Sequence, residues 1–275
     1  MSITDKRIAI QGIEGSFHHM VAQSFFDEHI AVTPCDSFAV LAKQLVSAHC
    51  TDAIMAIENS IAGAILPNYA LIDAHNLKIT GEHYLGINHN LMALAGQDIR
   101  AIKEVHSHPM ALLQCHNFFD AYPHIKLVED IDTAAVAKRI QDRQLSGIAA
   151  IASTTAAKLY ELEIIEPNIQ TIKDNATRFF ILNKNTQPVE GVDKASLRFT
   201  TEHKRGSLAT VLNVLSDCGL NLTKIQSMPI IETPWKYAFF VDVTFGTYEY
   251  FEKAKKILEI MAADFKVLGE YKNQR

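Results

Sequence analysis

Four short apolar stretches of the sequence are each followed by small and polar residues and then by a pattern typical of a helix. The polar clusters carry hydroxyl and amide side chains and lie at residues 12–16, 58–60, 107–109 and 153–155. Such side chains cap helix N-termini, where free N–H groups and the helix dipole also attract anions. At one edge of a sheet, the four clusters together would form a site for a small carboxylate-bearing anion, with plain capping as the alternative for each.

Individual residues of the clusters suit individual tasks. Gly12 and Gly15 allow a tight turn, and Ser16 can cap the helix that follows. Ser107 is predicted to cap the third helix, with Pro109 at its first position. The other two helix starts are marked by Glu58, Asn59 and Ser60, with Gly63 for a close approach, and by Ser153, Thr154 and Thr155.

Arg178 stands between polar residues and a strongly apolar run, in the stretch TIKDNATRFFILNK at residues 171–184. A guanidinium group is rarely buried without a partner, and its planar fork suits a carboxylate. Thr177 places a hydroxyl group directly beside it. We therefore expect Arg178 to bind a carboxylate at the entrance of a strand, with a surface ion pair as the alternative.

Metal and nucleotide chemistry find little support in the sequence. The chain has 12 histidines, among them His106 and His108, but no H-E-x-x-H pattern and no Cys/His ligand spacing. No G-x-G-x-x-G or P-loop pattern follows a predicted strand. We expect no metal and no bound nucleotide, and we interpret His108 as a hydrogen-bonding wall of the site.

The composition is that of an ordinary globular protein, with 275 residues, 48% hydrophobic and 21% charged. The net charge of −5 and the lack of a basic run argue against nucleic-acid binding. No apolar stretch has the length of a signal peptide or a membrane span. The four cysteines are widely spaced and resemble reduced, packed thiols, so we expect a cytoplasmic protein.

Two different rhythms divide the chain. Residues 1–184 repeat a strand, a polar cluster and a helix, which predicts an α/β domain of mostly parallel strands. A polar stretch with Pro188 and Gly191 gives a predicted linker at 185–194. Residues 195–275 follow the order βαββαβ, a small ferredoxin-like antiparallel sheet with two helices on one face and a turn at 232–235.

Taken together, the clusters resemble the motifs of the prephenate dehydratase family. The chain carries GIEGSFHHMVA like the opening glycine loop of that family, AIENSIAGAI like its Glu-Asn-Ser block, HSHPMALLQC like its Ser/His-Pro block, and NATRF with its Thr-Arg-Phe signature. The resemblance covers nearly the whole chain. It implies a two-lobed catalytic domain like a type 2 periplasmic binding protein, with lobes at about 1–80 with 160–184 and at 81–159, followed by a ferredoxin-like ACT domain.

The resemblance also implies a reaction, the decarboxylating dehydration of prephenate to phenylpyruvate in phenylalanine biosynthesis by a carbon–oxygen lyase without cofactor. Arg178 would bind a substrate carboxylate, and Thr177 would donate a hydrogen bond to the departing hydroxyl group. Glu58 would repel a dianion unless it is paired, which favours a structural role. The residues expected to line the substrate are Ser16, Asn59, Ser60, Ser107, His108, Ser153, Asn175 and Phe179.

The C-terminal part departs from the family at the motifs expected to bind L-phenylalanine as a feedback inhibitor. The expected effector residues are Gly206, Ser207, Leu208, Gln226, Ser227 and Pro229. Many relatives have Gly-Ala-Leu and Glu-Ser-Arg-Pro, where this chain has Gly-Ser-Leu and Gln-Ser-Met-Pro. The change from Arg to Met removes a donor fork, so a domain that only dimerises is the alternative. The resemblance implies a homodimer or homotetramer.

Two other functions stay open on the sequence. An arogenate dehydratase would act on a substrate with an amine in place of the keto group, and a non-catalytic small-anion sensor would use the same two-lobed fold. Thr177 beside Arg178 favours chemistry over sensing. A fused chorismate mutase is not expected, because no helical domain precedes the first strand at residues 7–10.

Overall fold

A computed structural model describes residues 6–27, 29–186, 189–202, 204–230 and 233–275. The chain divides into two compact units, one made of residues 1–64 with 84–179 and one made of residues 65–83 with 180–275. Strands β5 (Lys78–Gly86) and β11 (Ala176–Asn183) carry residues of both units. We describe each unit separately.

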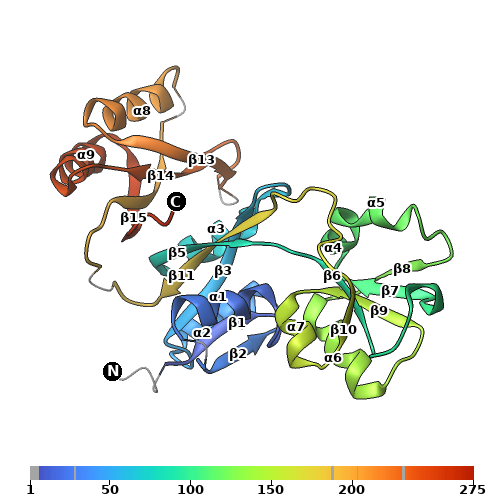
Figure 1. Ribbon diagram of the computed structural model, residues 1–275. Helices are drawn as coiled ribbons and strands as arrows, with labels where there is room; N and C mark the ends of the chain where they lie inside the picture. The colour runs from blue at the N-terminus through green and yellow to red at the C-terminus, as the bar shows by residue number, and fades with distance from the viewer. Residues whose placement is uncertain (1–5, 28, 187–188, 203, 231–232) are drawn as a thin grey trace. The chain divides into compact units, whose positions relative to one another are not determined.

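The first unit begins with a parallel sheet in which β1 lies between β2 and β3 (Figure 1). Val32 and Asp52 both pair with Ile8, and the β1 and β3 residues between the flanking helices are almost entirely buried. Helices α1 and α2 begin at Ser16 and Ser37, whose side chains accept backbone hydrogen bonds in the first turn. The bounds are β1 Ile8–Gln11, α1 Phe17–Phe25, β2 Val32–Cys35, α2 Phe38–Val46, β3 Asp52–Asn59 and β4 Gly63–Ala64.

The second sheet of this unit has the order β10-β6-β9-β7-β8. Strands β7, β8 and β9 are parallel, whereas β6 and β10 are antiparallel to their neighbours. The expectation of mostly parallel strands holds for β1, β2 and β3, whereas the second sheet has two parallel and two antiparallel pairings. The bounds are β6 Asn90–Ala93, β7 Glu104–Ser107, α4 Pro109–Gln114, α5 His116–Phe119, β8 Lys126–Glu129, α6 Thr133–Arg143, β9 Ile148–Ala152, α7 Thr154–Leu159 and β10 Glu163–Glu166.

The predicted lobe boundary at about residue 160 differs from the strand pairing. Strand β10 pairs with β6 through Glu163 and Ala93, so it belongs to the second sheet. The chain returns to the first sheet only with β11, which follows β5 and precedes β3 in the strand order. Local periodicity could not reveal this, because a short strand shows its sequence pattern but not its partner.

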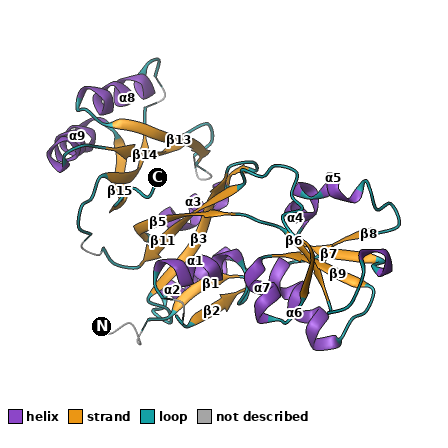
Figure 2. Ribbon diagram, viewed as in Figure 1, coloured by secondary structure: helices purple, strands orange, loops and turns teal. Residues whose placement is uncertain are grey.

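The second unit contains the predicted βαββαβ order, which we call the C-terminal module (residues 194–271; Figure 2). Its strands follow the antiparallel order β13-β14-β12-β15, and α8 and α9 pack on a core that includes Leu197, Val211, Phe251 and Leu258. Part of the predicted turn at 232–235 lies outside the described residues, and so does Pro188 of the predicted linker. The bounds are β12 Lys194–Thr200, α8 Ser207–Asp217, β13 Asn221–Pro229, β14 Tyr237–Thr244, α9 Tyr248–Met261 and β15 Ala263–Tyr271.

The second unit also includes α3 (Leu66–Ala74) and the neighbouring parts of β5 and β11. Strands β15 and β5 are parallel neighbours that share one residue pair, Gly269 with Ile79. A Cβ atom on Gly269 would overlap the carbonyl oxygen of Ile79, so only glycine permits this approach. Within the described residues, every helix is too short or too polar to cross a bilayer.

His18 gives the stability of the fold a pH dependence. Its ring packs against Phe38 and Phe179 at centroid distances of 5.5 and 5.0 Å, and burial lowers the pKa of His18 to about 3. In the unfolded chain, His18 has about the ordinary histidine pKa of 6.5. Below that pH, the unfolded chain therefore binds more protons than the folded chain. The free energy of unfolding should therefore fall as the pH drops from about 6.5 toward 3, by up to about 1.4 kcal/mol per unit.

Urea unfolding between pH 7 and pH 4 tests this expectation in the wild type and in His18→Gln. The variant should show a shallower loss of stability with falling pH, because glutamine does not titrate. His19, His83 and His89 also have pKa values lowered by burial, so some slope should remain in the variant. Equal slopes in the two proteins would contradict the assignment to His18.

Candidate functional site

A hydrogen-bonded group of amide and hydroxyl side chains joins the end of β3 to the start of β11. Nδ2 of Asn59 donates to Oδ1 of Asn175 at 2.7 Å and to Oγ1 of Thr177 at 3.0 Å. Oδ1 of Asn59 accepts from the backbone N–H groups of Ile61 and Ala62, so both ends of the amide are held. Asn59, Asn175 and Thr177 were all expected at the site, and the structure brings them together.

This group extends to two residues of the second sheet and its helices. Nδ2 of Asn175 donates to Oε1 of Gln114 at 2.9 Å, and Nε2 of His89 lies 2.9 Å from the same oxygen. His89 is buried, and burial lowers its pKa, which favours the neutral ring as the donor to Gln114. Sequence reasoning missed Gln114, although an amide at the end of the otherwise apolar segment PMALLQ is a signal that could have been used.

Arg178 is buried, with its side chain 2% exposed. NH1 of Arg178 lies 3.6 Å from Oε1 of Glu58, and its guanidinium carbon lies 5.8 Å from the centre of the Tyr84 ring. The alternative of a surface ion pair is therefore wrong for Arg178. Glu58 is 31% exposed and partly balances the charge of the guanidinium, in agreement with a structural role for this carboxylate.

Thr177 is positioned so that its hydroxyl group can donate. Its side chain is nearly buried, at 9% exposure, and its oxygen accepts the hydrogen bond from Asn59. Because the oxygen is already an acceptor there, the hydroxyl hydrogen stays available for a second partner. Strand alternation turns Thr177 and Arg178 to opposite faces of β11. The backbone conformation of β11 therefore determines where the Thr177 hydroxyl group and the Arg178 guanidinium can contact a ligand.

The glycine loop after β1 contacts helices of the second sheet. Gly12 and Gly15 have φ values of 85° and 87°, and Ser16 accepts a hydrogen bond from the His19 N–H group, as predicted. A Cβ atom on Gly12 would lie 2.6 Å from Oδ2 of Asp132, the residue that caps α6. Burial raises the pKa of Asp132. Close packing between the two sheets therefore adds a second reason for glycine at position 12.

Two of the predicted serines use their hydroxyl groups within the protein. Ser107 does not cap α4, because His108 is the N-cap and accepts a hydrogen bond from Met110. Oγ of Ser107 instead donates to the carbonyl oxygen of Ile151 at 2.7 Å. Ser153 caps α7 as expected, and its hydroxyl group donates to the carbonyl oxygen of Gly15 at 2.6 Å. Both serines position the second sheet and the glycine loop.

The cluster after β3 does not begin a helix, so that prediction is wrong. Helix α3 begins at Leu66, and Asn59 closes a turn with backbone N–H groups instead. Oγ of Ser60 accepts from the N–H group of Ala176 at 3.0 Å, which ties the turn to β11. Gly63 has a φ of 82° and no close neighbour at its Cβ position, so backbone conformation rather than close approach requires glycine.

The remaining predicted residues lie in different environments. Phe179 is 1% exposed and packs edge-on against His18, so its ring belongs to the core. His108 is exposed. In the C-terminal module, Gly206, Ser207 and Leu208 line a cavity of about 340 Å³ together with residues that include Trp235 and Phe239. Strand β13 carries the other three expected effector residues, Gln226, Ser227 and Pro229, which are not among the lining residues of that cavity.

The arrangement in the first unit suits a small anion. A buried arginine supplies the positive charge, and the hydrogen bonds of Asn59 to Thr177 and Asn175 fix polar groups at the neighbouring positions of the chain. In the described part of the chain, no three His, Cys, Asp or Glu side chains gather as metal ligands would. The fold is that of a two-sheet α/β protein with a βαββαβ module, and its first unit holds a buried arginine next in sequence to a hydrogen-bonded threonine.

Comparisons with known proteins define the family. The sequence profile of the family "Prephenate dehydratase" matches residues 8–187. The "Arogenate dehydratase/prephenate dehydratase 2, chloroplastic" of Arabidopsis thaliana is 35% identical over 279 residues, which cover 96% of this chain and 72% of that protein. This chain belongs to the prephenate dehydratase family and is an enzyme of that family.

Solved structures share the fold over nearly the whole chain. The prephenate dehydratase from Staphylococcus aureus subsp. aureus Mu50 superimposes with a TM-score of 0.83 and 25% identity, over 97% of this chain and 100% of that one. GqqA, described as a novel type of quorum quenching acylase, superimposes with a TM-score of 0.86 and 25% identity, over 97% of each chain. The same fold therefore occurs with two differently described activities, and the site must decide between them.

Proposed function

We propose that this chain converts prephenate to phenylpyruvate, and that Arg178 and Thr177 carry the reaction. The observation that supports this most strongly is a buried arginine beside a hydroxyl donor held by Asn59. Prephenate has two carboxylates and a ring hydroxyl group para to one of them. The bond between the ring and its carboxylate breaks, CO2 leaves, and the electron pair of that bond enters the ring. The carbon–oxygen bond opposite breaks, and the departing hydroxide takes a proton from solvent and becomes water. Aromatisation drives both steps without a cofactor.

The enzyme then needs to bind a dianion and to stabilise the departing oxygen. Arg178 binds one carboxylate through its planar fork, in a buried position where charge-assisted hydrogen bonds are strong. Thr177 donates a hydrogen bond to the leaving hydroxyl group as its negative charge develops. A threonine hydroxyl is too weak an acid to give up its proton at pH 7, so it acts as a positioned donor. Asn59 orients that donor, and Asn175 and Gln114 hold Asn59 in place.

We also propose that the chain has the domain organisation of a regulated member of its family. Residues 1–184 would form the two-lobed catalytic domain like a type 2 periplasmic binding protein, and residues 195–275 an ACT domain. L-phenylalanine would bind near Gly206, Ser207 and Leu208, which line a cavity in the module. Met228 supplies no donor fork, so binding there would be weaker than in relatives with arginine. A homodimer or homotetramer in the cytoplasm fits this proposal.

Arogenate is a second candidate substrate, because the relative at 35% identity is described as both an arogenate and a prephenate dehydratase. Arogenate differs from prephenate by an amine in place of the side-chain keto group. Recognition of the amine requires an acceptor or an acidic side chain near the carboxylate that Arg178 binds. Glu58, at 3.6 Å from the guanidinium and 31% exposed, is the acidic group nearest to such a position among the site residues described above.

Turnover of prephenate by the purified chain tests the proposal. Phenylpyruvate is measured by its ultraviolet absorbance in alkali, with and without L-phenylalanine, and phenylalanine formation from arogenate is measured in parallel. We expect turnover of prephenate and partial inhibition by L-phenylalanine. A folded protein that leaves both substrates unchanged would refute the dehydratase activity and direct attention to acyl-amide hydrolysis. If millimolar L-phenylalanine does not inhibit the enzyme, the module would serve only in assembly of the oligomer.

A further inference from the structure

A buried ion pair joins β5 to the first residue of the C-terminal module. Glu82 is fully buried, and the side chain of Lys194 is 3% exposed. Nζ of Lys194 lies 2.8 and 3.0 Å from the two carboxylate oxygens of Glu82. Because removing two charges from water costs several kcal/mol for each ion, such a pair contributes little net stability. The role of the pair is therefore better explained by the geometry that it fixes than by a contribution to the stability of the fold.

The chain that follows the module contacts the same ion pair. The backbone N–H group of Gln274 donates to Oε1 of Glu82 at 3.2 Å, and Nζ of Lys194 lies 3.4 Å from Oδ1 of Asn273. Asn273 is itself held by the Asp193 carboxylate, which accepts its N–H group at 2.6 Å. Glu82 therefore accepts hydrogen bonds both from the first residue of the module and from the chain that follows it.

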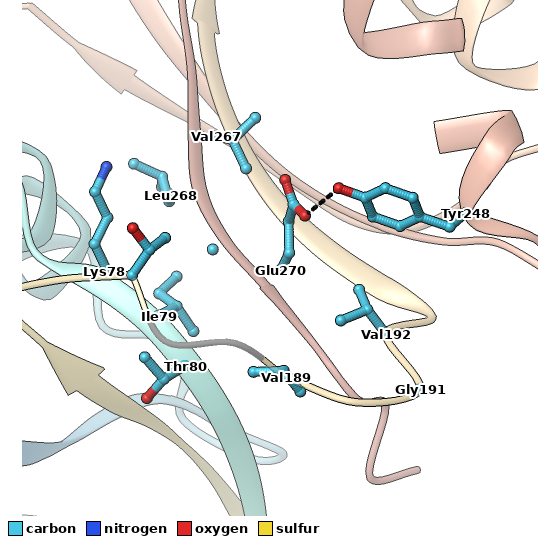
Figure 3. A pocket seen from close by; sticks show the side chains of 12 residues that line it. Lys78, Ile79, Thr80, Val189, Gly191, Val192, Tyr248, Val267, Leu268 and Glu270 are labelled. Carbon is cyan, nitrogen blue, oxygen red and sulfur yellow. Dashed lines mark hydrogen bonds between the residues drawn. The ribbon is translucent and has the colours of Figure 1, made fainter. Parts of the chain in front are cut away.

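Backbone contact between β5 and the module is sparse by comparison. Strands β5 and β15 share a single residue pair, Gly269 with Ile79. A cavity of about 580 Å³ lies beside this pair, lined by Ile79 and Thr80 of β5, by Val267 and Glu270 of the module, and by Val192 just before it (Figure 3). The ion pair adds a direct side-chain connection to this junction.

Both strands that hold the guanidinium of Arg178 are attached to the module two residues away. Tyr84, whose ring lies over the guanidinium at 5.8 Å, follows Glu82 by two positions and so faces the same side of β5. On β11, Phe180 follows Arg178 by two positions, and its ring packs against Tyr271 of the module at a centroid distance of 6.1 Å. Two short stretches of strand, from Glu82 to Tyr84 and from Phe180 to Arg178, therefore connect residues that contact the module with the residues around the guanidinium.

We infer that the Glu82–Lys194 ion pair is a positioning device for the active site: it fixes β5, and through Tyr84 it sets where the guanidinium of Arg178 can meet the substrate carboxylate. The inference rests on the proposed role of Arg178 as the carboxylate-binding residue. It makes Glu82, Lys194 and Tyr84 positioning residues rather than catalytic ones. It also gives the module a defined route by which a ligand bound there would change substrate affinity.

A neutral replacement of the pair tests the inference, with a second ion pair as the matched control. The test variant is Glu82→Gln with Lys194→Met, which neutralises both residues of the pair and keeps an acceptor for Gln274. The control is Asp73→Asn with Arg198→Met, which removes a 3.1 Å pair between α3 and the same strand β12, together with the contact of Arg198 with Asp264. The test variant should raise KM for prephenate by roughly twofold to thirtyfold with kcat little changed. The control should leave both constants near wild type.

A second variant keeps the test decisive if the first one folds poorly. Tyr84→Leu removes the ring from the guanidinium and leaves the ion pair intact. It should raise KM in the same way, and combining it with the neutral pair should raise KM no further, because both changes act on one connection. Independent, multiplying effects of the two changes would overturn the inference. So would a test variant that matches the control in KM.

Hydrogen exchange gives a readout that does not depend on activity. Peptides covering residues 81–87 and 175–180 should exchange faster in the neutral-pair variant than in the control, because β5 loses its anchor. A wild type without prephenate turnover would refute the proposed function, while the exchange comparison would still test the coupling. Equal exchange in the test variant and the control would overturn the coupling even in an active enzyme.

Discussion

Replacing Arg178 by lysine should lower kcat/KM for prephenate by about tenfold to a hundredfold, mainly through a higher KM. The guanidinium is buried, and a planar fork can form two hydrogen bonds with one carboxylate. Lysine keeps the charge and one donor but loses the fork and the stacking against Tyr84, so it forfeits one charge-assisted hydrogen bond of about 1.5–3 kcal/mol. Steady-state kinetics with prephenate measure the change.

The chain offers a matched control in Arg139→Lys. Arg139 is also paired, with NH2 at 2.6 Å from Oδ2 of Asp130, but it lies on α6 and is 30% exposed. Lysine there should leave kcat/KM within about twofold of wild type, since surface pairs contribute little. An Arg178→Lys enzyme with unchanged kcat/KM would refute the assignment of carboxylate binding to this residue.

The elements of the fold were predictable where burial and periodicity determine them locally. Strand β11 is an almost continuous buried run, and α8 places Val211 and Leu215 at helical spacing on the core. These patterns arise because one face of each element must leave water, which is a local property of the sequence. The βαββαβ order of the module follows from six such elements in succession.

The partners of the polar residues were much less predictable. Ser107 and Ser153 have the residue type of a helix cap or a ligand contact, but their hydroxyl groups donate to Ile151 and Gly15. Those partners lie 44 and 138 residues away in the chain, so spacing within a motif carries no information about them. Gln114 was missed for the same reason, because its bonds to Asn175 and His89 exist only in the folded chain.

The hydrogen bonds also connect motifs that lie far apart in the sequence. Asn59 donates to both Asn175 and Thr177, Asn175 donates to Gln114 of α4, and Ser153 donates to the glycine loop. Preorganised donors of this kind cost little reorganisation when charge develops in a transition state. Much of the polar sequence around Thr177 is therefore hydrogen-bonded within the protein.

Replacing Thr177 by valine should reduce kcat by about a hundredfold to a thousandfold with a much smaller change in KM. Valine has nearly the same shape but no hydroxyl group, so it removes the donor to the leaving oxygen, whose charge develops only in the transition state. The loss also leaves Nδ2 of Asn59 without one of its acceptors, although Asn175 still accepts from it at 2.7 Å. Thr177→Ser keeps the donor and should retain much more of the activity than the valine variant.

Stopped assays of phenylpyruvate formation, together with thermal unfolding of each variant, separate chemistry from folding. Thr200→Val is the matched control, because the Thr200 hydroxyl group also donates within a strand, to the carbonyl oxygen of Ala263 at 2.8 Å, but lies in the module. This control should keep kcat near the wild-type value. A higher KM with an unchanged kcat for Thr177→Val would make Thr177 a binding residue. Unchanged values of both kcat and KM in a folded variant would remove Thr177 from the mechanism.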